Sequence, residues 1–254
     1  MNFDNLQQAT IEALVRLAES REKSTGDHVE RTASLCELLI ELIRENGLHK
    51  DEVDQDYVSK MCLVSPLHDI GKVGIPDEIL LKPGKLTEDE FEVMKTHVDI
   101  GLKALTGLHE ALPEDDVLNM GIDVIKYHHE KWDGSGYPHG LKETEIPLPG
   151  RIMALVDVYE ALRSERVYKK AYSHECSCKI ICNDKGSHFD PQLVDLFIDR
   201  HEDFAAIYDM KKICYCIVRC LARFYAFLYI LPKGSLFFAL ISRQIVILYY
   251  LYVV

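Results

Sequence analysis

Repeated amphipathic helix patterns constrain the fold of this chain more than any other sequence feature. Apolar residues recur at spacings of three and four positions through most of the first 210 residues. One stripe consists of Leu6, Ile11, Leu14, Leu17 and Ala18, and another of Val29, Ala33, Cys36, Ile40 and Ile43. No alternating strand pattern or hairpin signal competes with these stripes. The chain is therefore predicted to be an all-α helical bundle.

Local signals predict several helix ends and the main loops. Thr87 and Glu90 have the spacing of a capping box, which would open a helix carrying Phe91, Met94 and Val98. Asp190-Pro191 should open another helix, since Asp is a good cap and Pro suits the first turn. Gly and Pro gather around residues 71–86 and 133–150, where the longest loops are expected.

Composition indicates one globular domain, assigned here to residues 1–210. The 254 residues are 48% hydrophobic and 28% charged, which is ordinary for a soluble protein with a sizeable core. The formal charge of −12 argues against binding to DNA or RNA polymers, which usually need a basic surface. A small anionic substrate is still compatible with this charge if metal ions and a few cations reverse the local field.

The last 44 residues, 211–254, differ sharply from the rest. All 41 acidic residues precede this tail, which keeps six of the 29 basic ones and is otherwise apolar and predicted helical. Residues 213–231 and 235–254 are long enough for a membrane hairpin, which would place the protein at the inner membrane. Arg219, Arg223 and Arg243 oppose that interpretation. A buried or partner-binding helical extension and out-of-frame translation of an AT-rich gene are the other two interpretations.

The eight cysteines lack the paired spacing of a zinc ribbon. With no N-terminal signal peptide, a reduced cytoplasmic body is the simplest interpretation. Cys36 and Cys62 fall on apolar helical positions and are expected in the core. Metal binding is conceivable for Cys176, Cys178 and Cys182, but no cysteine is expected to act as a ligand.

Histidine and aspartate form the most informative chemical pattern. The segment His68-Asp69-Ile70-Gly71-Lys72 is accompanied by His28, His97, the pair His128-His129 and Asp157. Imidazole and carboxylate hold divalent metals over oxygen-rich substrates, and a carboxylate can bridge two ions. The set predicts a multi-metal hydrolytic centre. Other histidines are each expected to be ordinary core or surface residues: His49, His109, His139, His174 and His201.

Helical geometry constrains how these residues can meet. Lys72 lies four residues beyond His68 and would share its face if an α-helix continued that far, whereas Asp69 would be turned about 100° away. Gly71 is expected to end that helix. The side chains of His128 and His129 should diverge, so both can serve only if metals sit between them or the helix end frays.

Longer motifs resemble a known family. Residues 128–138 read His-His-Glu-Lys-Trp-Asp-Gly-Ser-Gly-Tyr-Pro, and residues 68–77 read His-Asp-Ile-Gly-Lys-Val-Gly-Ile-Pro-Asp. Together they resemble the HD-GYP family, a branch of the HD phosphohydrolases named for the tripeptide Gly136-Tyr137-Pro138. The resemblance continues through residues 151–157, 166–169 and 188–191, and it covers roughly residues 6 to 208.

The resemblance implies an HD-domain helical bundle that hydrolyses cyclic di-GMP, a bacterial second messenger, to pGpG and in some members onward to GMP. By similarity, one metal site would consist of His28, His68, Asp69 and Asp157. The other would consist of Asp69, His97, His128 and His129, with Asp69 bridging two divalent ions, iron or manganese. Lys72 would act beside the metals. Tyr137, Arg166 and Lys169 would contact the nucleotide or its phosphates.

Chemistry at such a centre requires no protein nucleophile, because bound metal lowers the pKa of water for in-line attack on phosphorus. Lys72, Arg166 and Lys169 would add positive charge near the phosphoryl oxygens.

The chain also departs from the family. Some members bind a third metal through a Glu four residues before the first His; Ser24 stands there, which favours two metals. Val167 replaces a usual Pro and Arg163 a common small hydroxyl residue. Alternative functions are a cyclic di-GMP receptor with little activity, or an HD phosphohydrolase acting on another nucleotide. Partnership with diguanylate cyclases through Gly136-Tyr137-Pro138 is compatible with hydrolysis. Homodimerisation through residues 1–22 is less favoured than burial of that helix on its own bundle.

Overall fold

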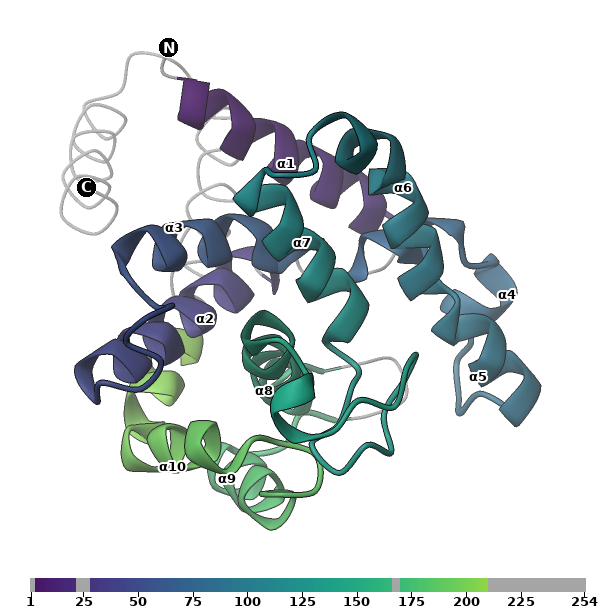
Figure 1. The fold of residues 1–254 in the computed structure, drawn as a ribbon. Helices are drawn as coiled ribbons and strands as arrows, with labels where there is room; N and C mark the ends of the chain where they lie inside the picture. The colour runs from purple at the N-terminus through teal and green to yellow at the C-terminus, as the bar shows by residue number, and fades with distance from the viewer. Residues whose placement is uncertain (1–2, 22–27, 166–169, 210–254) are drawn as a thin grey trace, which may run out of the picture. The chain divides into compact units, whose positions relative to one another are not determined.

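Helices build the part of the chain that the computed structural model describes, residues 3–21, 28–165 and 170–209 (Figure 1). Within these ranges the only β-type pairing is an isolated bridge between Lys185 and Phe189, so the all-α prediction is confirmed. The α-helices are α1 (Phe3–Glu19), α2 (His28–Glu45), α3 (Gln55–Val64), α4 (Asp77–Leu80), α5 (Glu88–Lys95), α6 (His97–Ala111), α7 (Asp116–Tyr127), α8 (Leu148–Arg163), α9 (His174–Asn183) and α10 (Pro191–Asp199). Two 3₁₀ helices, η1 (Ser65–Gly74) and η2 (Glu143–Glu145), and a helical segment over 201–209 complete the set.

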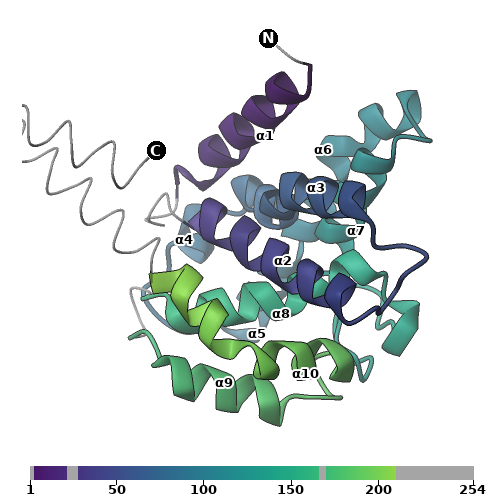
Figure 2. The same cartoon turned by 90° about the vertical axis from the view of Figure 1, so that its left-hand side faces the viewer.

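Helix α8 forms the centre of the bundle. Twelve of its 16 residues are buried, as expected for a helix that is apolar on nearly every side. It packs against α2, α7, α9 and α10. Figure 2 shows α2 between α3 on one side and α8 with α10 on the other. Polar side chains on α8, including Asp157 and Glu160, are therefore carried into the interior.

The η1 segment lies against several helices at once. It packs on α6 and α7, on α2 and α3, and on α1. The polar face of η1 is thereby brought to the ends of α6 and α7 and to the middle of α8, which bear the remaining histidines and Asp157. Helix packing, and not sequence proximity, therefore assembles the His and Asp set.

Several predicted helix signals are confirmed, but one predicted helix is two separate helices in the structure. The Thr87–Glu90 capping box is present at the start of α5, and Asp190 caps α10 by accepting from the backbone N–H of Gln192. Helix α5 ends at Lys95, and Thr96 separates it from α6, which carries Val98. Phe91 is 45% exposed, so the expected apolar stripe through Phe91 and Val98 is wrong.

Short helices interrupt the predicted loops. The region 71–86 contains the end of η1 and all of α4, and the region 133–150 contains η2 and the start of α8. Cys36 is fully buried in the core, as predicted, and Cys62 is partly buried against it. On α1, Val15 is buried in the bundle while Leu17 is 69% exposed.

Several predictions concern parts of the chain outside the described residues. They include Ser24, Arg166, Val167 and Lys169, and the three interpretations of the tail 211–254. No helix among the described residues combines the length and apolar character needed to cross a membrane.

Candidate metal centre

The His68-Asp69 pair lies on a 3₁₀ helix, η1, and not on an α-helix. A 3₁₀ helix has three residues per turn, so side chains three apart share a face. Lys72 consequently lies over Asp69, and its ammonium donates to Asp69 Oδ2 at 2.6 Å. Lys72 therefore does not share a face with His68, as it would in an α-helix. The prediction that Gly71 ends the helix is wrong, because Gly71 lies inside η1.

Gly71 allows η1 to lie directly against α6. A Cβ atom at this position would be 1.8 Å from the carbonyl oxygen of His97 and 2.6 Å from the backbone nitrogen of Gly101. Both atoms belong to the backbone of α6, so neither can move aside as a flexible side chain would. A side chain at residue 71 would therefore separate the η1 ligands from His97.

Three buried histidines are fixed in the same manner. The Nδ1 atoms donate to backbone carbonyls: His68 to Ser65 at 2.9 Å, His97 to Met94 at 2.8 Å, and His128 to Val124 and Ile125 at 3.0 Å each. With the proton on Nδ1, the neutral form of each ring carries its lone pair on Nε2. None of the three buried Nε2 atoms has a hydrogen-bond partner among the described residues. Such atoms are costly unless something binds them.

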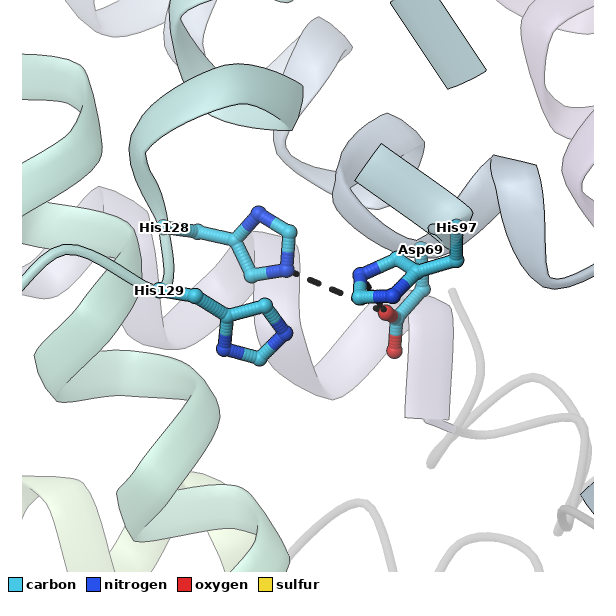
Figure 3. Close-up of side chains that lie close together, drawn as sticks. All are labelled: Asp69, His97, His128 and His129. Carbon is cyan, nitrogen blue, oxygen red and sulfur yellow. Dashed lines mark ion pairs between the residues drawn. The ribbon is translucent and has the colours of Figure 1, made fainter. Parts of the chain in front are cut away.

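Asp69 is the point on which these lone pairs converge. Its carboxylate oxygens lie 3.3 Å from His68 Nε2, 3.5 Å from His97 Nε2 and 3.9 Å from His128 Nε2. In Figure 3, His128 and His129 face Asp69 and His97 across a small gap. One ligand atom from each of these four residues lies within 4.8 Å of the other three. This is the spacing of a shared cation site.

The side chains of His128 and His129 meet because α7 ends just before them. Tyr127 is the last helical residue and His128 is the C-cap. The helix thus ends at the histidines, which corresponds to the second alternative in the sequence analysis, a frayed helix end. The ring centroids of His128 and His129 are only 3.9 Å apart, so the side chains do not diverge.

The remaining predicted ligands, His28 and Asp157, lie beside His68. His68 Nε2 is 3.8 Å from Asp157 Oδ1, and the ring centroids of His28 and His68 are 5.9 Å apart. The structure thus brings all seven predicted ligands into one cluster, called the Asp69 centre below: His28, His68, Asp69, His97, His128, His129 and Asp157.

Sequence reasoning missed a carboxylate that orients His28. Glu160, buried on α8, accepts from His28 Nδ1 at 2.9 Å. It also accepts from Arg31 Nε at 3.1 Å and from the Ser164 hydroxyl at 2.8 Å. A carboxylate that fixes one nitrogen of a histidine commonly accompanies metal binding through the other nitrogen. The available signal was spacing: Arg31 follows His28, and Glu160 follows Asp157, by about one helical turn.

The electrostatics favour a bound cation. Burial would raise the pKa of Asp69, but Lys72, His68 and His97 outweigh it and hold that pKa well below its usual value. Burial alone would lower the pKa of His68, yet Asp69 and Asp157 raise it to about 9. Burial and the neighbouring His68 lower the pKa of His128 to about 4. The centre therefore holds a fixed negative charge among imidazoles that are mostly neutral.

The Gly136-Tyr137-Pro138 loop closes one side of the centre. The Tyr137 ring stacks on His129 with centroids 4.6 Å apart, and its backbone N–H donates to the carbonyl of His129 at 3.2 Å. Lys95 Nζ lies 5.6 Å from the centroid of the Tyr137 ring. The buried carboxylate of Glu130, also missed from the sequence, accepts from the backbone N–H of His139 at 2.8 Å and shapes this loop. Tyr137 is thus placed beside the centre.

The donor set suits a hard or borderline divalent ion. The Asp69 centre offers imidazole nitrogens and carboxylate oxygens but no sulfur, and this combination fits iron, manganese or zinc. Three of its nitrogens are buried with no partner in the described part of the chain. The residues present therefore fit a metal.

Comparisons with known proteins agree with this chemistry. The HD domain family matches residues 12–193. The chain is 45% identical over 206 residues to a probable cyclic di-GMP phosphodiesterase of Vibrio cholerae, covering 81% of this chain and 47% of that protein. It is 39% identical over 210 residues to a cyclic di-GMP phosphodiesterase of Thermotoga maritima, covering 83% and 54%. It is also 40% identical over 206 residues to a 3′3′-cGAMP-specific phosphodiesterase of Vibrio cholerae, covering 80% and 37%.

The fold has a counterpart among solved structures. A cyclic GMP-AMP specific phosphodiesterase of Vibrio cholerae superposes with a TM-score of 0.52 at 16% identity, over 82% of this chain and 51% of that one. The chain spans about half the length, or less, of the curated relatives it matches.

Proposed function

This chain belongs to the HD domain family and to its HD-GYP branch, and we propose that it is a metal-dependent phosphodiesterase that hydrolyses cyclic di-GMP. The relatives that carry this activity by name match most of the chain at 37 to 45% identity. The proposed products are pGpG and, by further cleavage, GMP.

One observation carries the proposal. The Nε2 atoms of His68, His97 and His128 are buried, accept or donate no hydrogen bond within the described ranges, and are directed at one carboxylate. A buried set of this kind is expensive in a protein that binds no cation. Bound ions would offset this desolvation cost by replacing the hydrogen bonds that the buried nitrogens lack. This arrangement supports a catalytic domain over a receptor, which would not need a complete set of ligands.

We assign the ligands to two ions that share Asp69. His28, His68 and Asp157 serve one ion, and His97, His128 and His129 serve the other. Glu160 orients His28, and the backbone carbonyls orient three of the remaining histidines. Iron or manganese is the proposed metal, as the family resemblance implies, and the nitrogen and oxygen donors are compatible with either.

Residues around the ions have distinct tasks. Lys72 holds Asp69 charged and in position through its 2.6 Å hydrogen bond, and its ammonium adds positive charge for the substrate phosphate. Tyr137 forms a wall for the nucleotide, fixed by stacking on His129. Arg166 and Lys169, outside the described residues, are proposed to contact the phosphates. Bound ions would supply the activated water and stabilise charge on the phosphoryl oxygens.

The direct test incubates anaerobically purified protein, loaded with iron or manganese, with cyclic di-GMP and resolves pGpG from GMP. Hydrolysis should depend on metal and should disappear in the His68→Ala variant. This variant should also contain less metal per chain. His49→Ala, which alters a partly exposed histidine in the turn after α2, is the matched control and should remain active. Full activity of purified, folded His68→Ala would contradict the proposal.

A second substrate is favoured by one finding, the 40% identity to a 3′3′-cGAMP-specific phosphodiesterase. The same centre could accept that cyclic dinucleotide because the scissile phosphodiester chemistry is the same. Parallel reactions with both substrates decide the specificity: a higher kcat/KM for 3′3′-cGAMP would replace cyclic di-GMP as the assigned substrate.

A further inference from the structure

A second cluster of potential metal ligands shares no residue with the Asp69 centre. His174 and Cys178 lie on α9, and His201 begins the helical segment 201–209. One ligand atom from each lies within 4.8 Å of the other two. We propose that these residues, called the Cys178 cluster, bind a divalent ion of the zinc type. The sequence suggested metal binding by Cys178 only together with Cys176 and Cys182, and then as the less favoured interpretation; His174 and His201 were expected to be ordinary histidines.

Spacing along the chain favours the proposal. His174 and Cys178 are four residues apart on a helix, so their side chains lie on one face, one turn apart. His201 approaches that face from a different helix. Two ligands from one helix and one from another make a site that ties the two elements together. His174 and Cys178 alone would be no more than two neighbouring side chains on the surface of one helix.

The distances agree with tetrahedral ligation. Zinc–sulfur and zinc–nitrogen bonds of about 2.3 and 2.0 Å place two tetrahedral ligand atoms about 3.5 Å apart for S and N, and about 3.3 Å apart for two N. Cys178 Sγ lies 3.5 Å from His174 Nε2 and 3.7 Å from Nδ1 of the same ring, so the thiol must turn toward Nε2 to share an ion with it. His174 Nε2 lies 2.9 Å from His201 Nδ1, so these two rings need only a small separation to admit an ion. Water completes the fourth position.

A hydrogen-bond partner stands behind His174. Its Nδ1 lies 3.1 Å from the Tyr159 hydroxyl, which in turn accepts from Arg163 Nη1 at 3.0 Å. With an ion on Nε2, Nδ1 carries the proton and donates to the hydroxyl. Support of this kind for the other ring nitrogen is characteristic of metal-binding histidines. Tyr159 is fully buried on α8, so the cluster also connects α9 to the central helix.

The thiol sets the metal apart from that of the Asp69 centre. Sulfur and two imidazoles form a softer donor set than imidazoles and carboxylates, and this set selects zinc. Burial raises the pKa of the Cys178 thiol to about 11, so the thiol is protonated at neutral pH without metal and ligation releases that proton. The ion is proposed to stabilise the packing of α9 and to take no part in hydrolysis.

Cobalt(II) binding provides a test specific to sulfur. When apoprotein of the full chain is titrated with cobalt, the Cys178 cluster should give a thiolate-to-cobalt charge-transfer band, which the Asp69 centre cannot produce because it contains no sulfur. The band should disappear in Cys178→Ser and in His201→Ala, which alters the other helix. It should persist in Cys182→Ser, an exposed cysteine on the same helix.

Thermal unfolding in an Asp69→Asn background gives a second readout. Zinc should raise Tm by several degrees there, and the further change Cys178→Ser should remove most of that increase, since only an ion bound to the folded state stabilises it. The proposal is overturned if wild-type protein gives no thiolate band, or if the band and the zinc-dependent rise in Tm are unchanged in both Cys178→Ser and His201→Ala.

Discussion

The two histidine clusters of this bundle differ in how their ring nitrogens are satisfied. In the Asp69 centre, the Nδ1 atoms of His68, His97 and His128 donate to backbone carbonyls, and the Nε2 atoms have no hydrogen-bond partner in the part of the chain that the structure describes. In the Cys178 cluster, His174 and His201 lie within hydrogen-bond distance of each other. A bound cation would satisfy the Nε2 atoms of the first arrangement. The second arrangement already satisfies these ring nitrogens, and an ion would have to replace that contact.

This contrast predicts two different kinds of dependence on metal. A preorganised site loses little on binding and can hold reacting groups in fixed positions, which catalysis requires. A site that must first break an internal hydrogen bond binds less tightly for the same donors. The Asp69 centre is therefore expected to carry the chemistry, and the Cys178 cluster to contribute stability.

The largest expected effect is from Asp69→Asn. Loss of the shared charge should reduce hydrolysis by at least about a thousandfold, because both ions lose their common anionic ligand. Iron or manganese per chain should fall, measured by elemental analysis, while the thiolate-to-cobalt band stays. Cys178→Ser should show the reverse pattern, with hydrolysis within about threefold of wild type and no band. Equal loss of activity in both variants would remove the distinction between the clusters.

The next effect concerns the backbone contact that positions η1. Gly71→Ala places a methyl group where the His97 carbonyl oxygen already lies, so overpacking should reduce the free energy of unfolding by about 3 kcal/mol. The control is Gly107→Ala on α6, where an added Cβ meets nothing within 4 Å and should stabilise the helix by about 0.5 to 1 kcal/mol. Urea unfolding measures both. Similar stability in the two variants would show that η1 and α6 can separate freely.

A smaller effect is predicted for Glu160→Gln. This carboxylate orients His28, and loss of such support typically weakens metal binding 10- to 100-fold, or about 1.4 to 2.7 kcal/mol. The variant also breaks a buried ion pair with Arg31. Asp190→Asn is the matched control, because it breaks the buried pair with Arg151, at 2.8 Å, which involves no predicted ligand.

Metal titration of the two variants separates support of a ligand from general destabilisation. Circular dichroism first establishes that each is folded. Weaker metal binding in Glu160→Gln alone supports a positioning role for the carboxylate. Equal weakening in Asp190→Asn would mean that loss of any buried pair loosens the centre.

Local rules and motifs predicted much of this molecule, but contacts between distant helices were beyond them. The capping box at Thr87 was predictable because both partners lie within one turn. The seven residues of the Asp69 centre were predictable because their motifs occur together. Glu160 was not, since its partners His28 and Arg31 lie on α2, and a glutamate in a helix ordinarily faces solvent. The register of Lys72 was missed because nothing in the sequence distinguishes a 3₁₀ from an α-helical turn there.

The Cys178 cluster also depends on a contact between helices that local sequence rules do not predict. His174, Cys178 and His201 come together only when the segment after α10 packs beside α9. Considered along the sequence, the two histidines gave no signal of a site, and only the joint placement of the three residues in space suggests one.

The smallest predicted effect compares two buried carboxylates. Cations hold the pKa of Asp69 low, whereas burial raises the pKa of Asp123 on α7 to about 6, against the opposing effect of Lys126. A folded-state pKa above the ordinary aspartate value of 3.8 means that the folded protein binds this proton more tightly than the unfolded chain does. The stabilisation is therefore present below pH 3.8 and is lost as the pH rises through 6.

Asp123→Asn should remove the loss of stability at high pH, because an uncharged amide does not ionise in this half-buried position. Urea unfolding should show the variant about 1 kcal/mol more stable than wild type at pH 7, after allowance for solvent screening, and no more stable at pH 4. Asp99→Asn, at an exposed position on α6, should follow wild type at both pH values. An Asp123→Asn variant less stable than wild type at pH 7 would mean that burial alone does not explain the raised pKa. The contrast with Asp69 would then no longer isolate the role of neighbouring cations.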